Sequence, residues 1–214
     1  MITQRTLSLF ILYFFLGVQA NIYDFAVRLD LQNVYMVPLS TMQNYYVIIS
    51  IIWYFKWIPA ITSDLVGFRG YHRKPYMVIA NTAAFVFSMC LTIPHLPLSS
   101  YIALLTLTSI SICVADVNYD ACMVEDVRGS NGKQTMLTRI QLVRAFGGLV
   151  GNVTGPLVWP YIDSYGVFEV SAFISGFAAL ISAIVFIDYK REENVVSNAF
   201  GPGKGYDIQV WLLF

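Results

Sequence analysis

The sequence is poor in charge. Aspartate, glutamate, lysine and arginine make up 12% of its 214 residues, whereas soluble domains carry about 25%. Hydrophobic residues make up 57% and aromatic residues 15%. This composition excludes an ordinary soluble fold and indicates an integral membrane protein in contact with the lipid bilayer. The formal net charge is zero, which gives no indication that the chain binds nucleic acid.

Cysteine and histidine are also scarce. The three cysteines, Cys90, Cys113 and Cys122, lie in apolar segments and form no Cys-x-x-Cys pair, which favours buried apolar side chains over disulfides or metal ligands. The two histidines, His72 and His95, fall on opposite sides of the expected membrane. With no metal-ligand spacing, cofactor motif or activated nucleophile, we expect no enzyme activity, no metal and no cofactor.

Long apolar runs are what the sequence has in abundance. A membrane-spanning helix needs about 20 mostly apolar residues, and six runs come close to that length, at 7–26, 45–61, 76–93, 101–119, 140–159 and 167–187. A seventh run begins at Ile208 and stops at Phe214. We therefore predict an all-α fold with a six-helix transmembrane bundle at 1–190, a cytoplasmic linker at 191–207 and the start of a seventh helix at 208–214.

The basic residues predict the orientation of the bundle. Alternate connections carry nearly all of the lysine and arginine: Arg69, Arg73 and Lys74; Arg128, Lys133 and Arg139; and Lys190, Arg191 and Lys204. Arg5 precedes the first run, and the opposite side has only Arg28. Because loops rich in lysine and arginine stay in the cytoplasm, we expect both ends of the bundle to be cytoplasmic.

The connection between the second and third runs has an unusual composition. Residues 63–76 read SDLVGFRGYHRKPY and combine Asp64, Gly70, Arg73 and Lys74. A loop of the positive-inside type with a turn explains the two basic residues. It does not explain their combination with an acidic residue and spaced glycines, so this loop is a candidate functional motif.

The fourth run contains carboxylates where apolar residues are expected. Asp116 and Asp120 are four residues apart and share one helix face. Asp116 lies about 22 Å along the helix from its outer end, and a charge at such a depth usually faces a cavity or a partner. We expect Glu125 and Asp126, which follow, to be solvated outside the membrane, and we find no evident partner for Asp24 in the first run.

Two cations at a similar depth are candidate partners for these carboxylates. Lys56 lies late in the second run, and Arg144 lies about one turn inside the fifth. The fifth run also carries three glycines with a spacing of four, which predicts a close helix–helix contact; they are Gly147, Gly151 and Gly155. Arg144 falls on or near this glycine face, so we expect it to be buried against another helix.

The loop at 63–76 resembles the cytoplasmic gate motif of the major facilitator superfamily, in which an aspartate, a glycine and a basic pair form a salt-bridged latch. Together with WYFKWIPAITSD at 53–64 and ADVNYDACMVED at 115–126, it resembles the folate–biopterin transporter family over about residues 13–187. The sequence departs from the family pattern where Trp57 and Ile58 separate Lys56 from Pro59.

This resemblance implies that the chain is the N-terminal half of a major facilitator fold, or a fragment of a longer carrier. Such carriers bind substrate at the midplane between two six-helix halves and work by alternating access. The implied substrate is folate, biopterin or a related pterin. A second six-helix half would have to be supplied in cis or in trans.

Two interpretations of the buried charges remain open. Asp116, Asp120, Lys56 and Arg144 could form a structural ion network that closes the cytoplasmic gate, or some of them could bind substrate or a coupling proton. The chain could also be a non-transporting, degenerate scaffold, or a carrier of another organic solute. The sequence does not indicate which membrane contains it.

Overall fold

The computed structural model describes residues 4–68, 71–128 and 133–188, and the named elements in these ranges are all helical. In a bilayer a helix satisfies its own backbone hydrogen bonds, so apolar runs of this length fold as helices. In chain order the elements are α1 (Gln4–Leu29), the π-helical turn η1 (Asp30–Val34), α2 (Leu39–Ser50), the 3₁₀ turn η2 (Ile51–Phe55), α3 (Trp57–Leu65), α4 (Lys74–Cys90), α5 (Leu98–Arg128), α6 (Lys133–Leu180) and the π-helical turn η3 (Ile181–Val185).

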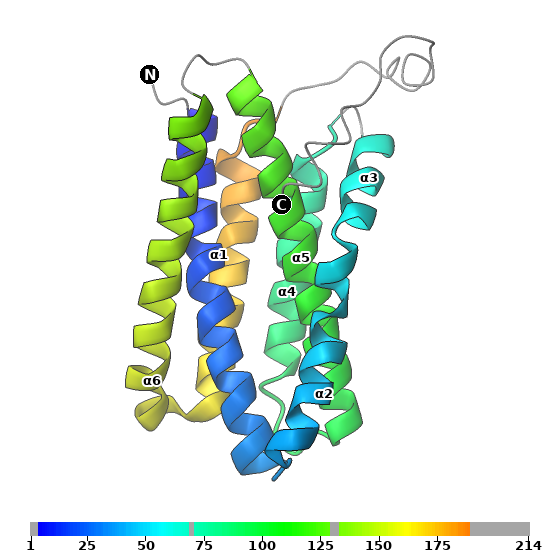
Figure 1. Ribbon diagram of the computed structural model, residues 1–214, viewed down its shortest axis with the longest axis vertical. Coiled ribbons are helices and arrows are strands. Elements are labelled where there is room, and N and C mark those ends of the chain that lie inside the picture. Colours follow the sequence, from blue (N-terminus) through cyan, green and yellow to red (C-terminus); the bar gives the residue numbers. More distant parts are fainter. Residues whose placement is uncertain (1–3, 69–70, 129–132, 189–214) are drawn as a thin grey trace.

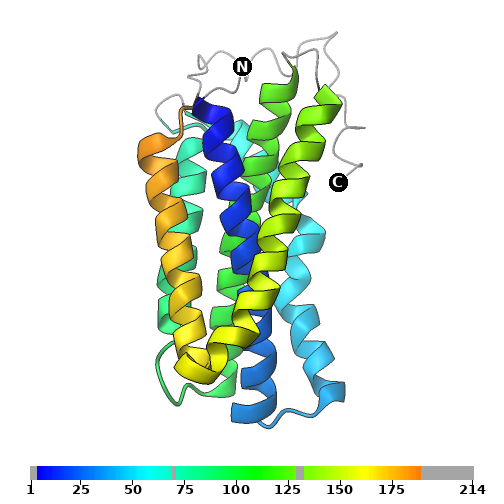
Figure 2. The same ribbon diagram turned by 90° about the vertical axis from the view of Figure 1, so that its left-hand side faces the viewer.

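α6 consists of two arms joined at a sharp bend. Pro156 and Pro160 lie just before the bend and offer no backbone N–H to the helix. Asp163 then adopts a φ of 54°, which is not helical. The chain reverses there, so the arms 133–162 and 164–180 run in opposite directions along the bundle (Figure 2). The two predicted runs at 140–159 and 167–187 are therefore joined by a turn centred on one residue.

Several helices are long and apolar enough to cross a membrane. They are Gln4–Val34, Leu98–Asp126 and Thr135–Val185, and the pair α2–α3, bent by 41°, makes a fourth if it is taken as one span. The multi-pass, all-helical class is therefore confirmed. The predicted count of six is met only in part by this criterion, because α4 has only 17 residues and the reversed Thr135–Val185 counts once.

The connections gather at two ends of the bundle (Figure 1). We call one of them the basic end, because Arg5, Arg73 and Lys74 lie there, near both ends of the described chain. The turns at 34–39 and 90–98 lie at the opposite end, together with the bend of α6. The predicted linker at 191–207 and the seventh helix at 208–214 lie outside the described residues.

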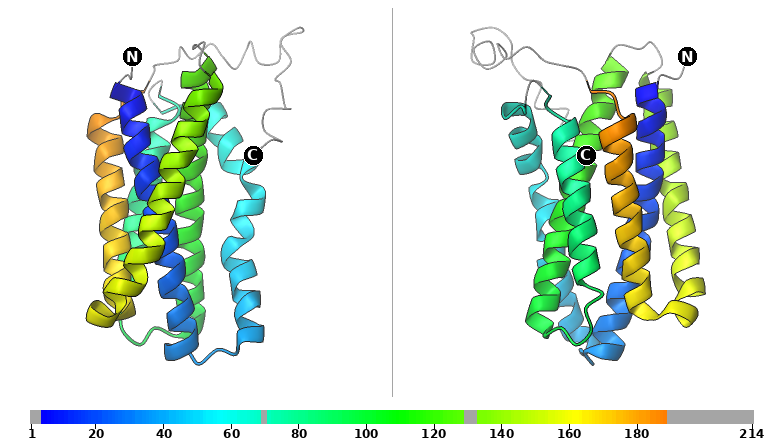
Figure 3. Two further views of the ribbon diagram at one scale, coloured as in Figure 1. Left: turned by 60° about the vertical axis from the view of Figure 1, so that its left-hand side comes forward. Right: turned by 180° about the vertical axis from the view of Figure 1, so that it is seen from behind.

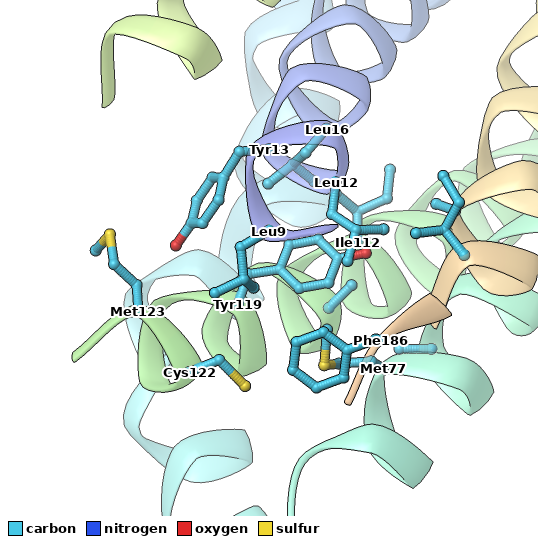
Figure 4. Packing of buried hydrophobic residues seen from close by; sticks show 14 of the residues in the cluster. Leu9, Leu12, Tyr13, Leu16, Met77, Ile112, Tyr119, Cys122, Met123 and Phe186 are labelled. Carbon is cyan, nitrogen blue, oxygen red and sulfur yellow. The ribbon is translucent and has the colours of Figure 1, made fainter. Parts of the chain in front are cut away.

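A tightly packed cluster fills the bundle toward the basic end. Leu9, Leu12 and Leu16 of α1 are buried there against Tyr119 and Met123 of α5 (Figure 4). Lipid tails are as apolar as leucine, so burial of these side chains gains little from excluding water, and close packing supplies the stabilisation instead. α1 makes its most extensive contact with α6, and the turned views show the two helices side by side (Figure 3).

Glycines bring α1 and the first arm of α6 into backbone contact. A Cβ built at Gly147 or Gly151 would lie very close to a backbone carbonyl oxygen of α1, and one built at Gly17 would lie closer than 3.0 Å to the carbonyl oxygen of Arg144. At Gly155 the nearest neighbour is the ring of Phe25, 3.2 Å away. The glycine face of α6 thus packs on α1, and Gly17 is its counterpart on α1.

Candidate functional site

Three charged residues from three parts of the chain meet inside the bundle. Lys56 Nζ donates a hydrogen bond of 2.6 Å to Oδ2 of Asp116 on α5. Arg144 of α6 places Nη1 2.9 Å from Oδ1 of the same carboxylate. Each carboxylate oxygen therefore faces a different cation. We call Lys56, Asp116 and Arg144 the charged triad.

Local breaks in the second span position Lys56. The residue lies between the 3₁₀ turn η2 and α3, and Pro59 just beyond offers no backbone N–H to the preceding turn. The span bends there by 41°. The Lys56 ammonium also lies 4.6 Å from the centre of the Trp53 ring, a distance at which the face of an indole attracts a cation.

The three members of the charged triad differ in exposure. The Asp116 side chain is 0% exposed, whereas Lys56 is 34% exposed and Arg144 30%. The carboxylate is thus buried between its two partners, while about a third of each cation's side chain remains exposed. One negative and two positive charges leave one positive charge in excess. Such an arrangement holds two cations in place, and its excess positive charge can attract an anion.

Asp120 does not join this triad. The hydroxyl of Tyr13 donates a hydrogen bond to Asp120 Oδ1, and within the described residues no lysine or arginine lies in ion-pair contact with it. The expected four-residue network is therefore a triad with Asp120 next to it. Nor do three histidine, cysteine or acidic side chains gather anywhere in the described ranges as a metal site would require.

A second charged cluster occupies the basic end, centred on Arg73. Its guanidinium binds Asp64 and the hydroxyl of Ser63, the latter at 2.6 Å, and lies 3.4 Å from Glu125 Oε1. Arg73 itself is 4% exposed. The structure therefore brings Asp64 and Arg73 of the predicted gate motif together and adds α5 to them. Gly70 lies outside the described residues.

Arg5 extends this cluster to α1 and corrects two expectations. Its Nη2 lies 2.9 Å from Glu125 and its Nε 3.1 Å from Asp126. The prediction that these two carboxylates are solvated was wrong, because the first turn of α1 packs over them and Arg5 is only 3% exposed. Asp24 likewise has a partner: Arg28, one turn later on the exposed outer part of α1, at 2.9 Å.

Lys74, the last residue of the predicted gate motif, is held by the residues that follow η3. The backbone N–H groups of Arg73 and Lys74 donate to Asp188 Oδ2 at 3.1 and 2.9 Å. Lys74 Nζ donates to the carbonyl oxygen of Phe186 at 2.9 Å. A carboxylate at a helix N-terminus satisfies unpaired donors and the helix dipole. Asp188 therefore ties the start of α4 to the end of the bundle's last helix.

We expect Arg73→Lys to lower the free energy of unfolding by about 1–3 kcal/mol, because one ammonium cannot reproduce several hydrogen bonds from a rigid guanidinium. Thermal unfolding of the purified chain in lipid nanodiscs would measure the change. Arg28→Lys is the matched control, because it alters an exposed pair worth less than about 1 kcal/mol. Equal effects of the two substitutions would contradict a structural role for the Arg73 cluster.

Sequence reasoning missed several members of these clusters. Ser63 and Asp188 carried no signal, because their roles depend on contacts with distant helices. Arg5 could have been found: it precedes Leu9, Leu12 and Leu16 at helical spacing and so lies on the buried face of α1. A cation on that face at the start of a helix predicts an acidic partner on a neighbouring helix.

The fold and the site together define a class of protein. A helical bundle with several apolar spans and ion pairs buried in its interior is a multi-pass integral membrane protein. The family follows from comparison with known proteins: residues 16–202 match the model of the BT1 family, and the chain belongs to that family. The resemblance inferred from the sequence motifs is thereby confirmed.

Relatives from Arabidopsis thaliana are named as transporters. The chain is 25% identical over 171 residues to probable folate-biopterin transporter 2, and the matched region covers 78% of this chain and 34% of that protein. It is 24% identical over 182 residues to probable folate-biopterin transporter 6, and the matched region covers 84% of this chain and 36% of that protein. The chain thus spans about a third of the length of these curated relatives. Their names agree with the expectation that the chain is not an enzyme.

Proposed function

We propose that the chain is the N-terminal six-helix half of a carrier for folate-like organic anions. The observation that carries this proposal is the charged triad, in which a buried carboxylate holds two partly exposed cations. Family membership and the names of the relatives supply the substrate class: folates carry carboxylates on a flexible tail. Arginine and lysine bind such groups through charge-assisted hydrogen bonds.

The role of Asp116 in this proposal is positioning. Both of its oxygens face cations and no part of the side chain is exposed, so it does not reach substrate while the triad is intact. Lys56 and Arg144 would contact the anionic group. Asp120, bound to Tyr13, would remain a candidate for substrate or proton binding beside them.

The six spans would be α1 with η1, the bent α2–α3 pair, α4, α5 and the two arms of α6 with η3. The basic end would face the cytoplasm, since positively charged connections remain on that side. The cluster of Asp64, Arg73 and Lys74 would act there as the gate motif. The second six-helix half would be supplied in cis beyond the linker at 191–207, or in trans.

Binding of folic acid to the purified chain in nanodiscs tests the proposal. We expect saturable binding in equilibrium dialysis, weakened about 10- to 100-fold by Arg144→Gln, because one charge-assisted hydrogen bond is worth about 1.5–3 kcal/mol. Arg28→Gln is the control, since Arg28 pairs with Asp24 near the opposite end. Uptake into proteoliposomes is then compared with uptake into vesicles without protein.

Other outcomes distinguish the remaining functions. Binding of an unrelated organic anion without folic acid or biopterin would indicate a carrier of another solute. Absence of binding by the correctly inserted chain for folic acid, biopterin and unrelated anions would contradict the proposal and favour a non-transporting scaffold. Uptake unaffected by Arg144→Gln would remove the triad from the substrate path.

A further inference from the structure

A shallow, open groove of about 440 Å³, which we call the cavity, lies between α1 and the first arm of α6. Three kinds of residue line it: four small residues that form the floor, four polar residues and one leucine. The small residues are Gly17, Ala20, Ala145 and Gly148; the polar residues are Asn21, Gln141, Asn152 and Arg144; and the leucine is Leu149.

The floor of this cavity is made of glycine and alanine residues where α1 and α6 meet. α1 and α6 approach so closely that a Cβ at Gly17 would lie 2.9 Å from the backbone nitrogen of Gly148. A Cβ at Gly148 would lie 2.9 Å from the Asn21 amide nitrogen. The Asn21 side chain therefore lies over Gly148, and elsewhere the floor carries nothing larger than the methyl groups of Ala20 and Ala145, beside which a flat group can lie.

The amides at one side of the floor are arranged in a fixed order. Asn21 Nδ2 donates to the carbonyl oxygen of Gly17, and Asn21 Oδ1 accepts from Asn152 Nδ2, both at 2.9 Å. The amide group of Asn21 is thereby engaged in hydrogen bonds on both sides, and it orients the amide group of Asn152. Asn152 retains one amide N–H and its Oδ1, and in the described part of the chain neither of these groups has a partner. A paired donor and acceptor at the edge of a floor can bind the N–H and carbonyl edge of a planar ring.

The face that carries these groups cannot lie against lipid. Gln141, Arg144 and Asn152 follow one another at helical spacing on α6, and unpaired amides in hydrocarbon cost several kcal/mol each. The neighbouring exposed stripe of the same arm is apolar: Leu142, Phe146, Val153 and Leu157. The polar stripe therefore faces water, and the apolar stripe faces lipid or another helix.

We infer that this cavity is the subsite for the flat, hydrogen-bonding ring of the substrate, with Asn152 as a specificity-determining residue. The inference rests on the proposed function, which places the anionic end of the same substrate at the charged triad. Arg144 borders both regions. It lies eight residues, or about 12 Å, from Asn152 along the helix, a spacing that suits a ring and a carboxylate joined by a linker.

Three probes with matched chemistry test the inference by equilibrium dialysis of the purified chain in nanodiscs. Folic acid has the ring and the anion, biopterin has the ring alone, and p-aminobenzoylglutamate has the anion without the bicyclic ring. We expect Asn152→Leu to weaken folic acid and biopterin at least 10-fold and to leave p-aminobenzoylglutamate unchanged. Arg144→Gln should weaken the two anionic probes and spare biopterin. The control is Val153→Leu, at the next position but outside the cavity.

Each other result has a defined meaning. If wild type binds folic acid and Asn152→Leu changes nothing, or weakens all three probes equally, the ring subsite is wrong and the anion site stands. If wild type binds none of the three probes, the proposed function and the ring subsite fall together. Monodisperse gel filtration of each variant is required before its affinity is compared.

Accessibility gives a second measurement that does not depend on affinity. In a Cys90→Ala background the remaining cysteines, Cys113 and Cys122, are buried, so a charged thiol reagent reports on a new cysteine. We expect Asn152→Cys to react readily and to be protected by biopterin, and Val153→Cys to react slowly and without protection. Slow reaction at both positions would show that lipid or protein covers this face and would overturn the inference.

Discussion

Replacing Asp116 with asparagine is expected to lower the free energy of unfolding by about 3 kcal/mol, near the lower end of the 3–5 kcal/mol seen when a buried ion pair loses one partner. The carboxylate is the shared counter-charge of two cations, and asparagine leaves both Lys56 and Arg144 uncompensated. The effect falls at the lower end because each cation keeps about a third of its side chain exposed and can turn partly toward water.

Thermal unfolding in nanodiscs measures this change, and Asp24→Asn is its control. Asp24 forms an exposed one-turn pair with Arg28, so its replacement should cost less than about 0.5 kcal/mol. A double variant, Asp116→Asn with Arg144→Gln, should recover part of the loss because it removes one of the two stranded charges. Unchanged stability of Asp116→Asn would show that the triad is not a structural unit.

Replacing Gly17 with alanine is expected to destabilise the chain by about 3 kcal/mol, at the upper end of the cost of overpacking a close contact. The added methyl group would meet the backbone of α6 at Arg144 and Gly148, and a backbone cannot turn aside as a side chain can. The helices would separate along their most extensive contact, and Arg144 would shift relative to Asp116. A reduced melting temperature together with weaker folic acid binding is the expected result.

Gly155→Ala is the matched substitution on the partner helix. Its new methyl group would meet only the Phe25 ring at 3.2 Å, which can rotate, and alanine favours a helix over glycine by about 1 kcal/mol. The two terms roughly cancel, so the melting temperature should hardly change. If Gly155→Ala were as damaging as Gly17→Ala, the backbone contact around Gly17 would not be the feature that matters.

Much of the bundle could be predicted because membrane spans follow from local composition. The apolar runs located every helix, and the spacing of four between Gly147, Gly151 and Gly155 identified a face that packs on α1 in the structure. The residues at which the helices begin and end were harder to predict. α1 begins before its apolar run, because Arg5 extends the helix once Glu125 and Asp126 take up its charge. The first arm of α6 also begins before its apolar run.

The site was predictable as a list of residues but not as an arrangement. Depth along a helix correctly grouped Lys56, Asp116 and Arg144, because rise per residue is fixed. It could not separate Asp116 from Asp120, which share a face one turn apart. Only the rotation of α5 against its neighbours decides that one meets two cations and the other meets the hydroxyl of Tyr13.

The contact between α1 and α6 also constrains the order in which the chain can assemble. Asn21 and Asn152, which join the two helices, are 131 positions apart. Synthesis at about 5–20 residues per second separates their appearance by about 7–26 s. For that time the first helix stands in the bilayer without the glycine face of α6 against Gly17 and without Asn152 to donate to Asn21 Oδ1. The lifetime of this partly assembled state determines how long the insertion machinery must protect the first helix from wrong contacts.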